Sequence, residues 1–329
     1  MKAYTRRTLL KSLGATALLT TGISSLVFAK GKDISKETRS LMDTLVTIEV
    51  RDSSYERRRE AITSAFEAIE RAIMLFDRYN ANSILALLNE QGKITSPPQE
   101  FISLITLSKQ LAHETKHLFN PTVQPLVDYF LQSNTFDSKK YKEARALVHT
   151  MDSVHIESSS ITLEHEGMGI TLDGIAKGYI IDIASIALSR HGIAHYMINA
   201  GGDIAVKGEQ SEGIAWTIGI QSPYHTERVI QSVALKQGAI ATSGGYERYN
   251  KDHSQYTHLI NPYTGKSPHR VRSVSVIAPQ AVLADALATA LSVMQPRDAL
   301  KYIARYPQSA CYIVTENTTI RSPLWGSLT

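Results

Sequence analysis

Residues 281–291 read AVLADALATAL, and this run predicts a helix because Ala and Leu have high helical propensity. Its polar residues are Asp285 and Thr289, and their spacing places both side chains on one helical face. A carboxylate and a hydroxyl on an otherwise apolar helix are costly to bury without partners. The pair either ligates a hard cation such as Mg2+, which prefers oxygen ligands, or is structural, with Thr289 bonding back to its own helix and Asp285 capping a neighbour.

The N-terminus has the pattern of an export signal. The pair Arg6-Arg7 precedes an apolar run from Leu13 to Phe28, which the small residue Ala29 ends. The run is too short and too rich in Thr, Ser and Gly for a membrane-spanning helix. We therefore expect residues 1–29 to be a twin-arginine signal, followed by one folded domain over residues 30–329. The protein is expected in the periplasm, and the sequence leaves open whether a retained signal keeps it at the inner membrane.

The charge balance depends on this signal. The chain has 35 Lys and Arg against 31 Asp and Glu. Four of the basic residues belong to the signal, so the remaining chain has no basic excess. This balance argues against nucleic acid or an anionic membrane as the main partner. The only cysteine, Cys311, lies in a strand-like run, so an intrachain disulfide is excluded and a buried structural thiol is expected.

The pattern of the rest of the chain predicts an α+β fold with largely antiparallel sheets and flanking helices. Strands alternate with turns more often than with helices, which is not the regular alternation of a parallel α/β fold. Helices are predicted at residues 56–76, 84–89, 101–117 and 180–191. Strands of one sheet are predicted at residues 45–50, 196–199, 216–220, 232–235 and 239–242, and a hairpin at 154–164.

A glycine-rich stretch, LDGIAKGY at residues 172–179, leads into a predicted helix. Glycines before a helix let the backbone approach a ligand closely and leave amide donors facing it. Lys177 is placed to meet a phosphate there. The alternative is a tight turn with a solvated lysine, because the stretch matches neither the Walker sequence nor the dinucleotide fingerprint.

Three further stretches combine glycine with polar side chains. NAGGD at residues 199–203 predicts a turn or a backbone that faces a ligand. TSGGYERY at 242–249 is followed by HLINPYTG at 258–265, which we interpret as a strand that carries His258 and then turns. His258 is a candidate general base, although a single histidine is more often structural. The 11 histidines include no zinc-type spacing.

Taken together, these stretches resemble the ApbE-like FAD:protein FMN transferases. The matching pieces occur in family order over nearly the whole chain that follows the signal. They are LMDT (41–44), YNANS (79–83), FNPTVQPLV (119–127), DGIAKGY (173–179), GGD (201–203), ATSG (241–244), HLINPYTG (258–265) and ADALAT (284–289).

The resemblance implies an enzyme that transfers the FMN half of FAD through a phosphoester to a Ser or Thr of a target flavoprotein and releases AMP, with Mg2+ required. It implies His258 as the catalytic residue. It implies metal ligation by Asp285 and Thr289, with contributions from Gly174 and Ala288. The residues that it implies as FAD contacts are Met42, Tyr79, Leu118, Phe119, Asn120, Thr171, Lys177 and Ile260.

The chain departs from the family pattern at three places. Many relatives carry Asp where Thr171 stands, and Gly or Ser where Asp173 stands. Since positions two apart in a strand face the same side, Asp173 is a candidate to replace that carboxylate. Asp43 stands where Gly is usual, and Asn120 replaces the usual Asp.

Two other functions remain open from the sequence. One is a Mg2+-dependent FAD pyrophosphatase, which would use the same metal and FAD site with water as acceptor. The other is a non-enzymatic FAD-binding protein, against which the presence of His258, Asp285 and Thr289 argues. The resemblance suggests an electron-transfer flavoprotein as the acceptor, and the sequence leaves open whether the chain forms a homodimer.

Overall fold

The computed structural model describes residues 33–132, 136–225, 227–246, 257–268 and 270–328. The predicted export signal lies outside them, and so do residues 247–249 of the third glycine stretch. Within the described part, no helix is both long and apolar enough to cross a membrane.

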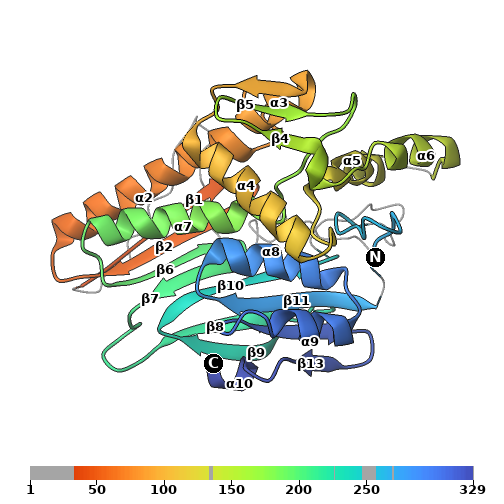
Figure 1. Cartoon of the computed structure of the whole chain (residues 1–329). Helices are drawn as coiled ribbons and strands as arrows, with labels where there is room; N and C mark the ends of the chain where they lie inside the picture. Colours follow the sequence, from red (N-terminus) through yellow and green to blue (C-terminus); the bar gives the residue numbers. More distant parts are fainter. Residues whose placement is uncertain (1–32, 133–135, 226, 247–256, 269, 329) are drawn as a thin grey trace, which may run out of the picture.

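The centre of the fold is an eight-stranded sheet in which every neighbouring pair is antiparallel (Figure 1). This confirms the expected α+β class. In spatial order its strands are β1 (Ile34–Leu41), β2 (Thr44–Arg51), β6 (His195–Ala200), β7 (Asp203–Lys207), β10 (Gln237–Gly244), β11 (Val271–Ala278), β12 (Ala310–Thr315) and β13 (Thr319–Arg321).

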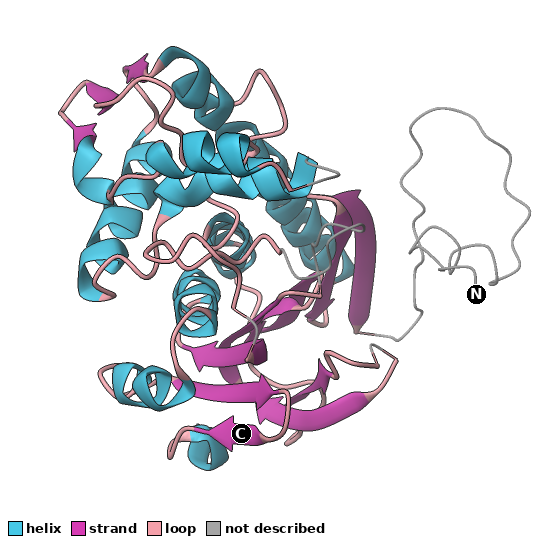
Figure 2. Ribbon diagram, turned by 90° about the vertical axis from the view of Figure 1, so that its right-hand side faces the viewer, coloured by secondary structure: helices cyan, strands magenta, loops and turns pink. Residues whose placement is uncertain are grey.

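Most of the helices gather on one side of this sheet (Figure 2). Two small sheets accompany it. The helices are α2 (Tyr55–Phe76), α3 (Ile84–Gln91), α4 (Gln99–Glu114), α5 (Gln124–Gln132), α6 (Ser138–Ala146), α7 (Ala176–Arg190), α8 (Ala281–Ser292), α9 (Pro296–Ile303) and α10 (Trp325–Leu328), with 3-10 turns η1 (Pro121–Val123) and η2 (Met151–Ser153). The small sheets contain β3 (Lys93–Thr95), β5 (Ser160–Leu163) and β4 (Val154–Ile156), and β8 (Trp216–Gln221) with β9 (Val229–Leu235).

Both faces of the large sheet are buried in its strands β10 to β12, and the strand alternation divides their side chains between two cores. In β10, Ala239 and Ala241 join the core beneath α2, α7 and α8, whereas Ile240 joins the core beneath β8 and β9. In β12, Cys311 belongs to the first core and Tyr312 to the second. A strand that is buried on both faces is apolar throughout, which explains the continuous apolar run around Cys311. Burial raises the pKa of this thiol to about 11, as expected for a structural cysteine.

Most elements expected from the sequence are present, with four corrections. The helix expected at residues 101–117 ends at Glu114, because the backbone turns left-handed soon afterwards. The helix expected at residues 180–191 begins earlier, at Ala176, so the glycine stretch forms its first turn. The strands at 216–220 and 232–235 form a separate two-stranded sheet that covers the large one. His258 lies in a bend and not in a strand.

Helices α7 and α8 cap each other. The side chain of Asp182 in α7 accepts hydrogen bonds from the backbone N–H groups of Ala281 and Val282, each at 2.9 Å. In return, Asp285 in α8 accepts one from the N–H of Gly178 at 3.0 Å. Carboxylates at helix N-termini satisfy unpaired donors and favour the helix dipole. This exchange fixes the start of each helix against the other, and burial raises the pKa of Asp182 despite the two donors.

The close approach of these helices requires the glycine at position 178. A Cβ there would lie 2.3 Å from the carbonyl oxygen of Ala281, a backbone atom that cannot move aside cheaply. We expect Gly178→Ala to destabilise the protein by about 2 kcal/mol in denaturant unfolding, the usual cost of overpacking. Gly326→Ala is the matched control, because that helical glycine faces open space. Equal free energies of unfolding for the two variants would contradict this prediction, because α7 and α8 would then accommodate the added methyl group.

Candidate active site

Two adjoining cavities lie between the helical layer and the large sheet, and they share Asp173, Lys177 and His258. The first is also lined by Leu118, Phe119, Asn120, Pro121, Val123, Val127, Thr171, Gly174, Thr242, Ser243, Leu259, Ile260, Asp285, Thr289 and Val293. The second is also lined by Met42, Asp43, Ile73, Phe76, Asp77, Tyr79, Ala176 and Ile180. All of the site residues expected from the sequence line one of these cavities, except Ala288, which is fully buried within α8.

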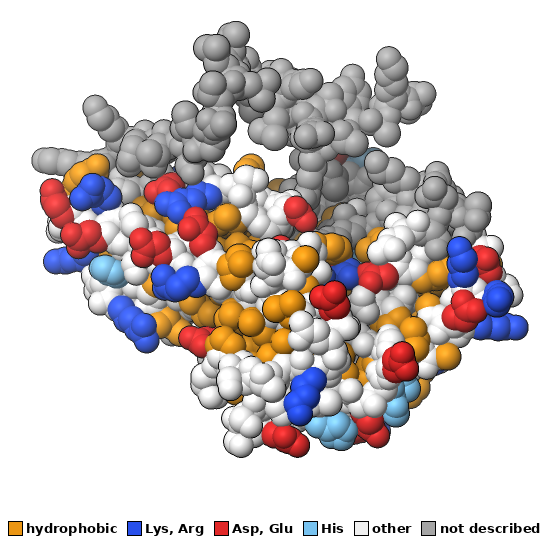
Figure 3. All heavy atoms as spheres, turned by 90° about the horizontal axis from the view of Figure 1, so that it is seen from above, with side chains coloured by type: hydrophobic (Ala, Val, Ile, Leu, Met, Phe, Trp, Pro, Cys, Tyr) orange, Lys and Arg blue, Asp and Glu red, His pale blue; other side chains and the backbone are white. Residues whose placement is uncertain are grey.

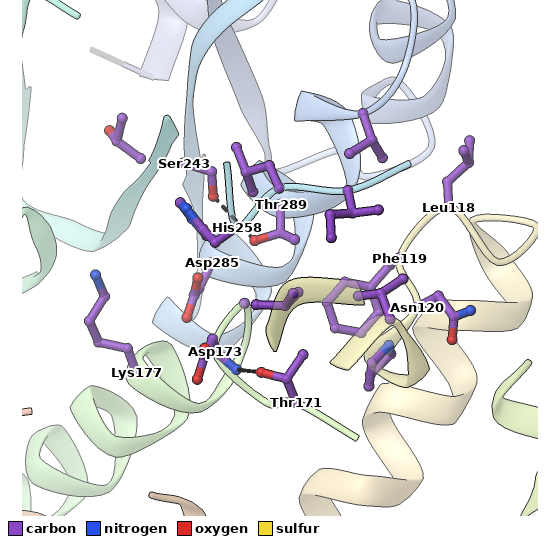
Figure 4. Close-up of a pocket in the computed structure, with 18 residues that line it drawn as sticks. Leu118, Phe119, Asn120, Thr171, Asp173, Lys177, Ser243, His258, Asp285 and Thr289 are labelled. Carbon is purple, nitrogen blue, oxygen red and sulfur yellow. Dashed lines mark hydrogen bonds between the residues drawn. The ribbon is translucent and has the colours of Figure 1, made fainter. Parts of the chain in front are cut away.

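The polar face of α8 opens into the first cavity. Figure 4 shows Asp285 and Thr289 on the same side of it as Ser243 and His258. The hydroxyls of Thr289 and Ser243 lie 3.2 Å apart. Asp285 is only 5% exposed, and it both caps α7 and lines the cavity. The structural and the cation-binding interpretations of this carboxylate are therefore compatible with each other.

The groups around Asp285 fit a hard cation. Asp285 and Thr289 offer a carboxylate and a hydroxyl, the oxygen donors that Mg2+ prefers. Gly174 lies so close to this face that an added Cβ would be 2.7 Å from the Thr289 hydroxyl oxygen. The absence of a side chain at position 174 therefore keeps the backbone close to Thr289. Gly174 would add its carbonyl oxygen to the donor set.

Lys177 is positioned by a buried carboxylate. Its Nζ atom lies 3.2 Å from Oδ2 of Asp203, which is only 2% exposed and begins β7. Burial raises the pKa of Asp203, and the nearby ammonium opposes that rise. Lys177 in turn lines both cavities. The GGD turn and the glycine stretch thus meet at an ion pair beside the site.

Arg78 organises the boundary between the two cavities. Its side chain is only 4% exposed, and its guanidinium forms ion pairs with Asp128 at 2.6 Å and Asp173 at 3.2 Å. It also donates a hydrogen bond to the hydroxyl of Tyr79 at 2.6 Å and lies over that ring at 4.3 Å. Arg78 therefore holds two of the expected FAD-contacting residues, Tyr79 and Asp173.

We expect Arg78→Met to destabilise the protein by about 2–3 kcal/mol, because two carboxylates would lose a buried cation. Arg39→Met is the matched control. Arg39 also pairs with two carboxylates, those of Glu37 and Glu70, and lies over an aromatic ring, but it is 22% exposed. Ion pairs that water reaches more readily contribute less, about 1 kcal/mol or below. Urea unfolding measures both variants, and equal losses would contradict the role given to Arg78.

The wall opposite α8 is the segment of Leu118, Phe119 and Asn120 (Figure 4). The side chain of Asn120 accepts hydrogen bonds from Thr122 and donates one to the carbonyl of His149 at 2.8 Å. A carboxylate at this position has no N–H to donate, so the amide suits this chain's own loop. The departure from the family pattern at Asn120 has a structural reason here.

The structure also shows how the chain accommodates its other two departures from the family pattern. Thr171 and Asp173 both line the first cavity, although no strand places them there, and the N–H of Asp173 donates to the Thr171 hydroxyl at 3.2 Å. Met42 and Asp43 form the turn between β1 and β2 with φ of 53° and 55°. Two left-handed residues are typical of a two-residue hairpin turn. Asp43 therefore adopts the backbone conformation that glycine would favour.

Sequence reasoning missed Arg78, Ser243 and Asp203 as site residues. Arg78 precedes Tyr79 directly in the expected loop, but nothing in its neighbours shows that Asp128 and Asp173 converge on it. Ser243 and Asp203 belong to the quoted glycine stretches. A polar residue next to a glycine pair was the available signal for both.

Comparisons with known proteins agree with this geometry. The model of the ApbE family matches residues 42–313. The FAD:protein FMN transferase of Vibrio cholerae is 33% identical over 189 residues, which cover 55% of this chain and just over half, 56%, of that protein. The FAD:protein FMN transferase of Escherichia coli K12 is 28% identical over 258 residues, 74% of this chain and 73% of that protein.

Two solved structures share the fold. The flavin transferase ApbE from Vibrio cholerae superposes with a TM-score of 0.79 at 23% identity, covering 90% of this chain and 99% of that one. The ApbE protein of Thermotoga maritima superposes with a TM-score of 0.80 at 27% identity, with the same shares covered.

Proposed function

The chain belongs to the ApbE family, and on that premise we propose that it is an FAD:protein FMN transferase. It would move the FMN half of FAD onto a Ser or Thr hydroxyl of a target flavoprotein and release AMP. One observation supports this proposal most: Asp285, Thr289, Lys177 and His258 line the same cavity as the Leu118–Asn120 segment.

The two cavities suit the two chemical parts of the substrate. The second cavity offers an aromatic ring at Tyr79 and apolar groups at Ile73 and Ile180, which suit a flat heteroaromatic ring. The residues shared by both cavities are charged or titratable, and a pyrophosphate would lie beside them. Lys177 would attract its negative charge, and Asp203 would hold the ammonium in place.

Phosphoryl transfer of this kind requires little covalent chemistry from the protein itself. His258 would accept the proton of the acceptor hydroxyl as that oxygen bonds to the phosphorus of the FMN half. The pyrophosphate bond on the other side of this phosphorus would break, and AMP would leave with the bridging oxygen. When bound at Asp285, Thr289 and Gly174, Mg2+ would neutralise charge on the phosphate oxygens.

We propose further that the protein works outside the cytoplasm. The twin-arginine pattern of residues 1–29 supports export of the folded chain, and the acceptor would then be a flavoprotein in that compartment.

The experiment that tests the proposed function is the intact mass of a flavin-acceptor domain after incubation with this protein, FAD and Mg2+. A gain equal to one FMN, lost when Mg2+ is chelated, is the expected result. AMP release with no gain on any acceptor Ser or Thr would contradict transfer and favour the pyrophosphatase. FAD that stays intact and bound would contradict both enzymes.

A further inference from the structure

Outside the active site, two histidines and an aspartate converge at the end of α4. Nε2 of His113 lies 3.0 Å from one carboxylate oxygen of Asp152, and Nε2 of His117 lies 3.8 Å from the other. The candidate ligand atoms of all three residues lie within 4.8 Å of one another. Figure 3 views the molecule from above and shows several histidine side chains beside acidic ones at the surface.

The backbone is arranged to bring the second histidine back toward the first. Helix α4 ends at Glu114, and Lys116 and His117 then adopt left-handed φ of 51° and 58°. This conformation is uncommon for residues other than glycine. It places the two imidazole rings 5.3 Å apart, centre to centre. Residues 113 and 117 are four apart, a spacing that also brings side chains together on a helix, so the two rings stay in contact although α4 has ended.

The third group is held in place from another segment. Asp152 lies in η2, which packs on α4. The hydroxyl of Thr150 lies 3.1 Å from Oδ2 of Asp152 and accepts from its N–H. Nδ1 of His117 is buried and has no hydrogen-bonding partner among the described residues, so Nε2 is the atom through which this ring reaches Asp152. The result is a set of two nitrogen donors and one carboxylate.

We propose that His113, His117 and Asp152 bind Zn2+. Neutral imidazole nitrogen with a carboxylate is a usual donor set for Zn2+, and Mg2+ prefers oxygen alone. Three protein ligands leave one position of a tetrahedral site for water. Bond lengths of about 2.0–2.1 Å place tetrahedral ligand atoms roughly 3.3 Å apart. The His113 nitrogen and Asp152 oxygen, now 3.0 Å apart, would separate a little, and the wider pairs, all within 4.8 Å, would move closer together. His113 and Asp152 are exposed and His117 is partly exposed, so the ion has an open path to the cluster.

The zinc site would also brace one wall of the active-site cavity. His117 is followed directly by Leu118, Phe119 and Asn120, which line that cavity. On the other side of the site, the chain that carries Asp152 includes His149, whose carbonyl accepts the hydrogen bond from Asn120. Bound Zn2+ would therefore join the two segments that fix this wall. The proposal does not depend on the transfer activity.

The test uses the full chain after removal of metal, with excess Mg2+ present to occupy the oxygen ligands of α8. Competition with a chromophoric chelator measures Zn2+ affinity. We expect one Zn2+ per chain, with affinity lowered at least tenfold by His113→Ala and by Asp152→Asn. His155→Ala is the matched control and should change affinity less than twofold, because His155 is an equally exposed histidine paired with Glu164 outside the cluster.

Two further readouts separate a built site from loose surface binding. Co2+ in place of Zn2+ should give ligand-field absorption bands that His113→Ala abolishes. Zn2+ should slow hydrogen exchange in residues 116–120 of the wild type and not of His113→Ala. Absence of Zn2+ binding, or equal affinity in wild type and both variants, would overturn the site. Unchanged exchange with Zn2+ bound would overturn its link to the cavity wall.

Discussion

Asp285→Asn is expected to reduce FMN transfer about 1,000-fold, which corresponds to about 4 kcal/mol of lost transition-state stabilisation. The change removes the charge that would hold Mg2+ beside the pyrophosphate. It keeps an oxygen that can accept the hydrogen bond from Gly178, so the start of α7 stays capped. Initial rates of acceptor flavinylation measure the effect. Mn2+ binding, followed by electron paramagnetic resonance, gives a second readout that does not require turnover.

The control for this substitution is Asp182→Asn. Asp182 is the partner carboxylate of the same helix pair, accepts from the N–H groups of Ala281 and Val282, and lies outside both site cavities. Its substitution should leave the transfer rate within about threefold, well under the 1.4 kcal/mol that a tenfold change represents. Wild-type transfer and Mn2+ binding in Asp285→Asn would contradict the assignment of Asp285 to the metal.

His258→Ala is expected to lower the transfer rate by roughly 100- to 10,000-fold, the usual contribution of a positioned general base. FAD affinity should change less than about threefold, because the remaining walls of the two cavities are intact and a tenfold change would need 1.4 kcal/mol. FAD fluorescence titration and single-turnover flavinylation measure the two quantities separately. Added imidazole should restore part of the rate, since the substitution leaves room beside Asp173 and Lys177.

The outcome of this experiment distinguishes two roles for the histidine. If His258→Ala loses FAD binding in proportion to its rate, His258 is a binding residue and another group must take the proton. Ser243→Ala is a useful comparison, because Ser243 lines the same cavity next to Thr289. The Ser243→Ala variant should transfer FMN without added imidazole, because the hydroxyl of Ser243 does not take part in the proposed proton transfer.

The local sequence predicted helices and strands well where composition was decisive. The run at 281–291 is helical because Ala and Leu favour a helix, and Ser83 begins α3 by accepting from the N–H of Ala86 at 3.0 Å. The strand around Cys311 was apparent because it is buried on both faces. The prediction was wrong where a contact with a distant segment sets the first residue of a helix. Helix α7 begins at Ala176 because Asp285, far along the chain, accepts from Gly178.

The sequence by itself predicted the α+β class, and its resemblance to the ApbE-like transferases pointed to most of the residues that line the candidate site. Those motifs are local, so each of them can be recognised within a few consecutive residues. Tertiary structure alone decided which charges meet: Arg78 with Asp128 and Asp173, Lys177 with Asp203, and His113 and His117 with Asp152. Each of these contacts joins segments that are distant in the chain. Their distances are set by how helices and strands pack, which no single stretch of sequence encodes.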